Sequence, residues 1–215
     1  MYQYLLFDLD GTLTDPKEGI TKSFQYALRH CGIEEKLENL NRVIGPPLID
    51  SFCEFYGMDM KQAKFAVEKY RERFAQTGIY ENKLYPGVEE MLDELKHVGK
   101  KVALATSKPL IFASEILRNF NIDSYFDVVM GSELDGSRSK KAEVIKEVFR
   151  QFSDPPLEEG LMIGDRRQDI AGAVEFGVAS LGVRFGYAEP GELEEAGADF
   201  LVNTVEELRR FLLAH

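Results

Sequence analysis

The sequence predicts an α/β protein with a doubly wound parallel sheet and a small helical domain inserted after the first strand. Short apolar runs alternate with helical patterns from about Tyr85 to the end, which is typical of a parallel sheet covered by helices on both faces. The segment from about Pro16 to Asn82 has helical patterns and no convincing strand. We therefore expect residues 1–15 and 83–215 to form the α/β core, and residues 16–82 to form a helical cap.

Six runs of the core have the length and composition of buried strands. Each is short, mostly apolar and bounded by turn residues or charged residues, as expected for strands covered on both faces. The predicted strands are 4–7, 101–105, 126–130, 161–163, 179–183 and 200–202.

Apolar residues at helical spacing predict the helices. Val88, Met91 and Leu95 share one helical face, and Gly99 is expected to end that helix as a C-terminal cap. Similar patterns cover 111–120, 142–152, 170–176 and 205–213 in the core. In the inserted segment they cover 20–31, 48–55 and 65–75, with a turn at Gly45, Pro46 and Pro47.

Composition excludes several classes of protein. A net charge of −11 repels polyanions, so we expect no nucleic-acid partner. No apolar run approaches the roughly 20 residues that span a bilayer, and the N-terminus lacks the pattern of a signal peptide. We expect a cytoplasmic protein with Cys31 and Cys53 as free thiols. The apolar stripes are accounted for by core and cap, which predicts a monomer or a weak homodimer.

Two aspartates, Asp8 and Asp10, follow the first predicted strand. Ligands of open α/β sheets bind at the carboxyl ends of strands, and residues two apart point to the same side of an extended chain. Two neighbouring carboxylates repel each other unless a cation lies between them or one is protonated. Mg²⁺ prefers such oxygen ligands. Asp10 and Gly11 are also typical of a tight turn. A turn and a cation site can occur together, because the turn could position Asp10.

A second acidic strand end follows residues 161–163. Asp165 and Asp169 come after Gly164, a residue that lets the backbone approach a ligand. Either aspartate is also suited to cap a helix. A helix cap would explain one aspartate, but not the presence of acidic residues at two strand ends.

Hydroxyl and lysine side chains lie near two other helix starts. Thr106 and Ser107 end a predicted strand, where they could hold a phosphoryl oxygen or simply cap the next helix. Lys140 and Lys141 stand where a helix begins, and a lysine is unfavourable at that positive end of the helix dipole. This position indicates a functional lysine more strongly than another position would, and a solvated lysine stays open as the alternative.

Four segments in this order resemble the four motifs of the haloacid dehalogenase superfamily. They are residues 7–13, residues 104–109, Lys141 and residues 163–169. The inserted helical segment is similar to the cap of the phosphoglycolate phosphatase-like and β-phosphoglucomutase-like branch. Residues 44–48 and 84–88 resemble the phosphoglycolate phosphatases, pyrophosphatases and nucleotidases of that branch.

The resemblance implies a Mg²⁺-dependent phosphohydrolase that acts on a small phosphorylated metabolite through an aspartyl-phosphate. It implies that Asp8 is the nucleophile and that Asp10 is the general acid and base. Lys141, with Lys140 as second choice, would neutralise charge on the phosphate. The implied metal ligands are Asp8, the Asp10 carbonyl, Asp165 and Asp169. The implied phosphate ligands are Thr106 and Ser107. In the cap, Gly45, Pro46 and Pro47 form the implied substrate loop, and Asp15 is the implied hinge.

Four alternatives stay open at the level of sequence. A phosphomutase has the same catalytic parts, whereas a haloacid dehalogenase does not keep an aspartate at the position of Asp10. A receiver domain and a non-catalytic binding protein on this fold are the other two.

Tyr187 and Glu189 lie on a loop that could approach the site.

Overall fold

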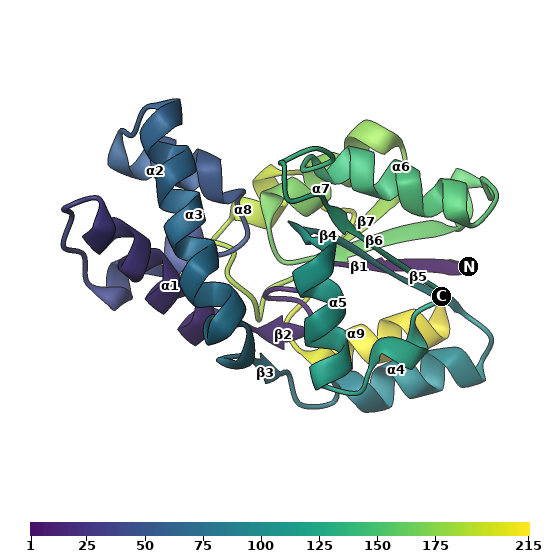
Figure 1. Ribbon diagram of the computed structural model, residues 1–215. Coiled ribbons are helices and arrows are strands. Elements are labelled where there is room, and N and C mark those ends of the chain that lie inside the picture. Colours follow the sequence, from purple (N-terminus) through teal and green to yellow (C-terminus); the bar gives the residue numbers. More distant parts are fainter. The chain divides into compact units, whose positions relative to one another are not determined.

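The chain divides into two compact units. A computed structural model describes residues 1–215, in which Met1–Asp15 and Leu84–His215 form an α/β core and Pro16–Lys83 form a helical unit (Figure 1). The chain leaves the core at strand β2 (Thr14–Asp15) and returns at strand β3 (Lys83–Leu84). The expected boundary after Asn82 is one residue early, because the division falls inside the two-residue strand β3.

The core contains a six-stranded parallel sheet, which confirms the predicted fold class. Its strands pair in the order β5-β4-β1-β6-β7-β8. Parallel pairing joins each neighbouring pair of strands. The strands are β1 (Tyr4–Phe7), β4 (Lys101–Pro109), β5 (Val128–Ser132), β6 (Gly160–Gly164), β7 (Ala179–Val183) and β8 (Phe200–Val202).

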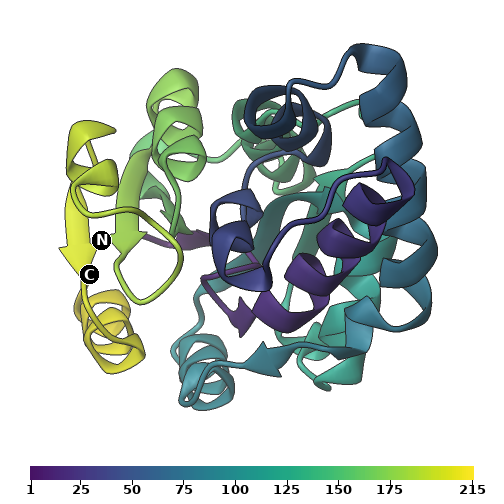
Figure 2. The same ribbon diagram turned by 90° about the vertical axis from the view of Figure 1, so that its left-hand side faces the viewer.

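Helices cover both faces of this sheet. Helices α6 (Lys141–Gln151) and α7 (Arg167–Phe176) lie on one face (Figures 1 and 2). Helices α4 (Val88–His97), α5 (Leu110–Asn119) and α9 (Val205–Ala214) lie on the other. The core also contains the short helix α8 (Glu192–Glu195) and the 3₁₀ turns η3 (Asp123–Tyr125) and η4 (Leu157–Glu159).

A tightly packed apolar layer joins α6 and α7 to the sheet. Leu6, Ala103 and Met162 from three strands contact Val148 and Phe149 of α6 in one buried cluster. Burying each large apolar side chain stabilises the fold by about 1.5–3 kcal/mol. This layer packs α6 and α7 against the sheet.

The topological switch point of the sheet lies between β1 and β6. From β1 the chain goes on to β4 and β5 on one side, and from β6 it goes on to β7 and β8 on the other. Phe7 is in register with Ile163, and the backbone N–H of Asp8 donates to the Ile163 carbonyl at 2.9 Å. Ligands of open α/β sheets bind at this kind of crevice, so the segments after β1 and β6 define the candidate site.

Two strands differ by more than one residue from their predicted ranges, and β6 extends one residue beyond its predicted range at each end. β4 continues beyond Ala105 to Pro109, with an irregular register on β5. The prediction ended the strand with its last apolar residue, whereas the strand goes on through the polar residues that follow. β5 begins at Val128 rather than at residue 126. Before this start, the backbone N–H of Val102 in β4 donates to the Asp127 carboxylate at 2.9 Å. A side chain therefore accepts the hydrogen bond that a backbone carbonyl of β5 would accept in a longer strand.

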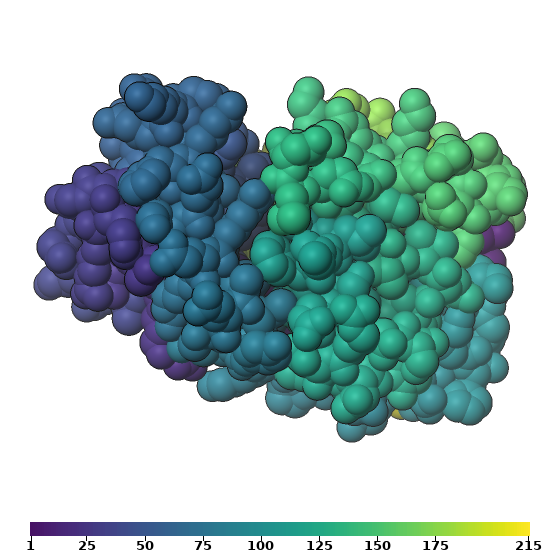
Figure 3. Space-filling view, viewed as in Figure 1, coloured from purple at the N-terminus to yellow at the C-terminus, as the bar shows by residue number.

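The helical unit matches the three predicted helices and adds two 3₁₀ segments. Phe24 of α1 (Lys17–His30) stacks on Phe52 of α2 (Leu48–Tyr56) with ring centroids 4.0 Å apart. Asp59 caps α3 (Met60–Gln76), whose side chains form an outer surface of this unit (Figure 3). The added segments are η1 (Leu37–Val43) and η2 (Gly78–Tyr80). Across the whole chain, every helix is too short or too polar to cross a bilayer.

Candidate active site

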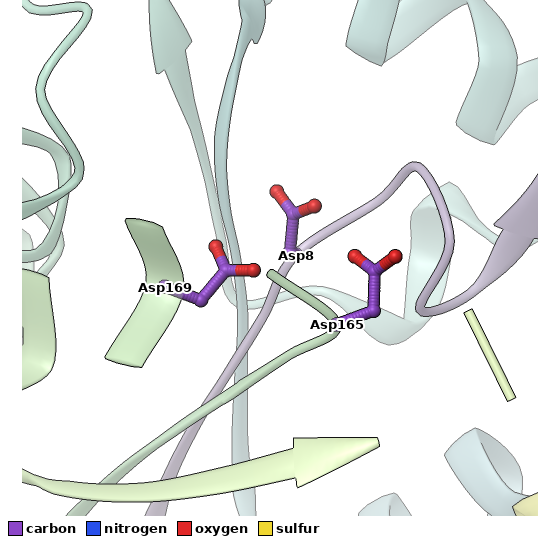
Figure 4. Close-up of side chains that lie close together, drawn as sticks. All are labelled: Asp8, Asp165 and Asp169. Carbon is purple, nitrogen blue, oxygen red and sulfur yellow. The ribbon is translucent and has the colours of Figure 1, made fainter. Parts of the chain in front are cut away.

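Three buried carboxylates meet at the switch point. Asp8 directly follows β1, Asp165 directly follows β6, and Asp169 lies in the first turn of α7. One oxygen from each lies within 4.8 Å of the others, and Figure 4 shows the three side chains extending into the same space. The two acidic strand ends recognised in the sequence therefore form one cluster.

Lys141 neutralises part of this cluster. Its Nζ lies 2.7 Å from Asp8 Oδ1 and 2.8 Å from Asp169 Oδ1, and it donates to the Ala105 carbonyl at 2.8 Å. Lys140 precedes α6 and is exposed, so of the two candidate lysines only Lys141 reaches the cluster. A Cβ on Gly172 would stand 2.6 Å from Lys141 Cβ, so the glycine allows α7 to pack closely beside this lysine.

Burial and mutual repulsion set the protonation equilibria of the cluster. Burial, followed by the charges of Asp169 and Asp8, raises the pKa of Asp165 well above its usual value. Burial raises the pKa of Asp169 to about 6, although Lys141 opposes this shift. Burial alone would lower the pKa of Lys141, but Asp169 and Asp8 outweigh it and raise that pKa. The site thus favours positive charge.

Asp10 has a different partner. Its carboxylate pairs with the ammonium group of Lys108 near the end of β4, and Asp10 Oδ1 is buried without a hydrogen-bond partner. Burial raises the pKa of Asp10, and the charge of Lys108 opposes the shift. The Asp10 carboxylate is not part of the three-carboxylate cluster. The sequence interpretation missed Lys108, whose only signal was its position two residues after Thr106.

The predicted turn after β1 also shapes the site. Gly11 has a φ of +84°, and its N–H donates to the Thr14 carbonyl at 2.7 Å. A Cβ at this position would stand only 2.0 Å from Asp165 Oδ2. The turn and the acidic cluster therefore coexist, and only glycine leaves room for the Asp165 carboxylate.

Thr106 and Ser107 lie at the same edge of the sheet as Asp8. β4 pairs with β1 so that Leu104 is in register with Phe7, which places Thr106 on the neighbouring strand end. Thr106 is buried, and its Oγ1 accepts a hydrogen bond from the Lys108 N–H at 3.2 Å. The Ser107 carbonyl accepts a bond from Ser132 Oγ at 2.8 Å. Binding of phosphate by this pair stays a prediction.

Comparison with known proteins decides the family. The model of the haloacid dehalogenase-like hydrolase family matches residues 5–183. The chain belongs to this family. The match includes the strand ends after β1, β4 and β6 and the start of α6, which carried the resemblance in the sequence. Membership excludes the receiver-domain alternative.

Relatives of this hydrolase cover its full length. A 5′-nucleotidase from Pseudomonas aeruginosa is 45% identical over 100% of the chain and 97% of the relative. Tyrosine-protein kinase PtkA from Mycobacterium tuberculosis is 35% identical over 98% of the chain and 72% of the relative. The crystal structure of a predicted phosphatase from Clostridium acetobutylicum is 44% identical, with a TM-score of 0.97 and complete coverage of both chains. Family, relatives and structures identify the chain as a phosphatase.

The loop after β7 also reaches the carboxylate cluster of this hydrolase. The N–H of Tyr187 donates to Asp165 Oδ2 at 2.7 Å, and the Tyr187 hydroxyl donates to Asp15 Oδ1. The N–H of Glu189 donates instead to Glu192 Oε2 at 3.0 Å. Of the two loop residues noted in the sequence, Tyr187 contacts the carboxylate cluster.

The donor set fits a divalent cation. Four buried carboxylates face two ammonium groups, which leaves a formal excess of two negative charges. Asp165 Oδ1 is buried with no hydrogen-bond partner, so one cluster oxygen has an unused lone pair. Hard cations take carboxylate oxygens, and a divalent ion would neutralise the excess charge. The charged residues are Asp8, Asp10, Asp165, Asp169, Lys108 and Lys141.

Proposed function

We propose that this hydrolase is a Mg²⁺-dependent phosphatase that cleaves a small phosphate ester with Asp8 as its nucleophile. The observation that carries the proposal is the environment of Asp8. Its carboxylate lies at the switch point, 2.7 Å from the ammonium group of Lys141 and beside two further buried carboxylates. Burial of this much charge contributes little to folding but suits a site that must bind both a cation and a phosphate.

In the proposed first step, an oxygen of Asp8 attacks phosphorus and the bond from phosphorus to the ester oxygen breaks. The product is an aspartyl-phosphate, so one difficult displacement becomes two easier ones. Lys141 holds Asp8 Oδ1 and places positive charge beside the phosphoryl group. The Thr106 hydroxyl and the Ser107 N–H would bind phosphoryl oxygens at the neighbouring strand end.

Asp10 is the proposed proton carrier. It would donate a proton to the leaving alkoxide and then take one from the water that attacks the aspartyl-phosphate, releasing phosphate and restoring Asp8. Its raised pKa, caused by burial, suits a group that must carry a proton during the first step. Lys108 bonds to Asp10 Oδ2 and so fixes the orientation of this carboxyl group.

We propose that Mg²⁺ is held by the carboxylates of Asp8, Asp165 and Asp169 and by the backbone carbonyl of Asp10. When bound, the ion supplies positive charge that stabilises the transferring phosphoryl group. Support comes from the buried cluster and from its unpartnered oxygen on Asp165.

Nucleoside 5′-monophosphates are the substrate class that we propose. The support is the 45% identity, over the whole chain, to a relative named a 5′-nucleotidase. Pyrophosphate and phosphoglycolate are the next candidates, from relatives that are 30% and 29% identical. Gly45, Pro46 and Pro47, between η1 and α2 of the helical unit, stay the proposed substrate loop.

The test is phosphate release from nucleoside monophosphates, pyrophosphate, phosphoglycolate and hexose phosphates, with Mg²⁺ and with EDTA. We expect turnover that requires Mg²⁺ and falls at least about 1000-fold in Asp8→Asn. Asp93→Asn, a change of the same kind at a half-exposed side chain of α4, is the matched control and should retain turnover. No release from any ester would contradict the proposal, and isomerisation of a hexose phosphate without release would identify a mutase.

A further inference from the structure

The loop after β7 packs directly on one carboxylate of the acidic cluster. A Cβ on Gly186 would stand 2.4 Å from Asp165 Cβ and 2.4 Å from the Gly11 carbonyl oxygen. At the next residue, the Tyr187 N–H donates to Asp165 Oδ2 at 2.7 Å. One oxygen of Asp165 is therefore fixed by this loop, while Oδ1 has no protein partner.

The side chain of the same tyrosine reaches the point where the chain leaves the core. Its hydroxyl donates to Oδ1 of Asp15, the last residue of β2 and of the first core segment. Tyr187 is therefore bonded at its backbone to the acidic cluster and at its side chain to an acceptor 172 residues earlier in the chain.

The returning segment of the core contacts the same loop. The N–H of Tyr85 donates to the Leu13 carbonyl at 3.0 Å, which joins the returning chain to the turn before β2. The Tyr85 ring packs edge-on against Phe185, with centroids 5.3 Å apart and planes at 77°. The loop is thus held by packing at Phe185 and by hydrogen bonds of the Tyr187 hydroxyl with Asp15 and Tyr85.

We propose that Tyr187 is a positioning residue for the metal site. Its hydroxyl bond to Asp15 fixes the loop so that its N–H holds Asp165 Oδ2, which directs Asp165 Oδ1 toward the cation. The inference rests on the proposed function, since it concerns the metal of that same site. Partners of metal ligands orient those ligands, and their loss commonly lowers metal affinity or activity about 10–100-fold.

Removing single hydrogen-bonding groups tests this role. Tyr187→Phe deletes the hydroxyl but keeps the ring and the backbone N–H, and Asp15→Ala deletes its acceptor. We expect each to weaken Mg²⁺ binding by calorimetry about 10-fold and to lower kcat, with little change in KM. Asp15→Asn keeps an oxygen acceptor and should bind Mg²⁺ nearly as the wild type does. The double variant Tyr187→Phe with Asp15→Ala should be no worse than either single change.

A matched control lies in the helical unit. Tyr26→Phe removes a tyrosine hydroxyl that donates to Glu72 Oε1 at 2.7 Å, the same chemical change at a pair outside the core. It should leave Mg²⁺ affinity unchanged. Circular dichroism with thermal unfolding shows that each variant is folded before binding is measured.

Two outcomes would overturn the inference. Either Tyr187→Phe binds Mg²⁺ as the wild type does, or Asp15→Asn is as impaired as Asp15→Ala. Because Mg²⁺ binding is measured without substrate, a wild type that binds Mg²⁺ but hydrolyses nothing would count against the proposed function alone. A wild type that binds no Mg²⁺ would overturn both.

Discussion

Two ion pairs with the same nitrogen–oxygen distance lie in contrasting regions of the molecule. The nitrogen–oxygen distance is 2.7 Å in both pairs. One pair is Lys141 with Asp8 in the core, and the other is Lys69 with Glu72 in the helical unit. The core side chains are 3% and 9% exposed, whereas those of the helical unit are 27% and 46% exposed. An exposed pair contributes little to stability, but a buried charge left without its partner is strongly destabilising.

The contrast extends to the whole interior of each unit. The buried polar side chains of the helical unit are hydroxyls of Thr21, Ser23 and Ser51, while every buried charged side chain lies in the core. Replacing buried ion pairs with apolar side chains is often neutral or stabilising in proteins. Folding therefore does not account for the carboxylate cluster and Lys141, whereas the proposed binding of a cation and a phosphate would.

The largest expected effect is on Lys141. Lys141→Met keeps the length of the side chain but leaves Asp8 and Asp169 buried without an ammonium partner. We expect the free energy of unfolding to fall by about 3–5 kcal/mol, measured by urea denaturation of the metal-free protein. Lys69→Met, the matched change in the exposed pair, should alter it by about 0.5 kcal/mol or less. Equal effects of the two changes would remove the basis of the comparison.

A second test compares two glycines with positive φ. Gly11 and Gly32 have φ of +84° and +75°, but a Cβ on Gly11 meets Asp165 whereas a Cβ on Gly32 meets nothing within 4 Å. We expect Gly32→Ala to lower the free energy of unfolding by about 1–2 kcal/mol through backbone strain. Gly11→Ala should lower it by about 2–4 kcal/mol, because overlap of the new Cβ with Asp165 adds to the strain. Thermal unfolding measures both changes. The idea fails if Gly11→Ala is the milder change or if it binds Mg²⁺ normally.

The smallest expected effect has the opposite sign. Asp165→Asn removes a buried ionisable group whose charged form is disfavoured by burial and by Asp169 and Asp8, and the amide oxygen can still accept from the Tyr187 N–H. The metal-free variant should gain on the order of 1 kcal/mol of stability. When Mg²⁺ is added at 100 times its Kd, the free energy of unfolding of the wild type should rise by about 2.7 kcal/mol, and that of the variant should rise much less. A variant that is less stable without metal, yet stabilised normally by Mg²⁺, would contradict this account.

Much of the site could be predicted because it follows from local patterns. Asp8 and Asp165 follow apolar runs that form adjacent strands, and carboxyl ends of parallel strands meet at one edge. The choice of Lys141 over Lys140 was also encoded locally. Lys141 shares a helical face with the buried residues Val144, Ile145 and Val148, whereas Lys140 precedes that helix.

The remaining contacts depend on distant parts of the chain. The Lys108–Asp10 pair joins residues 98 apart, and the Tyr187–Asp15 bond joins residues 172 apart. Their formation depends on strand order and on the path of one loop, which a periodic pattern does not specify. The late start of β5 has a similar cause, because the Asp127 side chain bonds across to the backbone of Val102.

The position of β1 has a consequence for synthesis on the ribosome. This first strand is central in the sheet, with Tyr4 paired to Lys101 on one side and to Gly160 on the other. At 5–20 residues per second, its second partner emerges on the order of ten seconds later. During that time, residues 16–83 can already fold through contacts within their own segment. The strand that precedes Asp8 is thus translated well before both of its partners in the sheet, and Asp8 acquires its surroundings late.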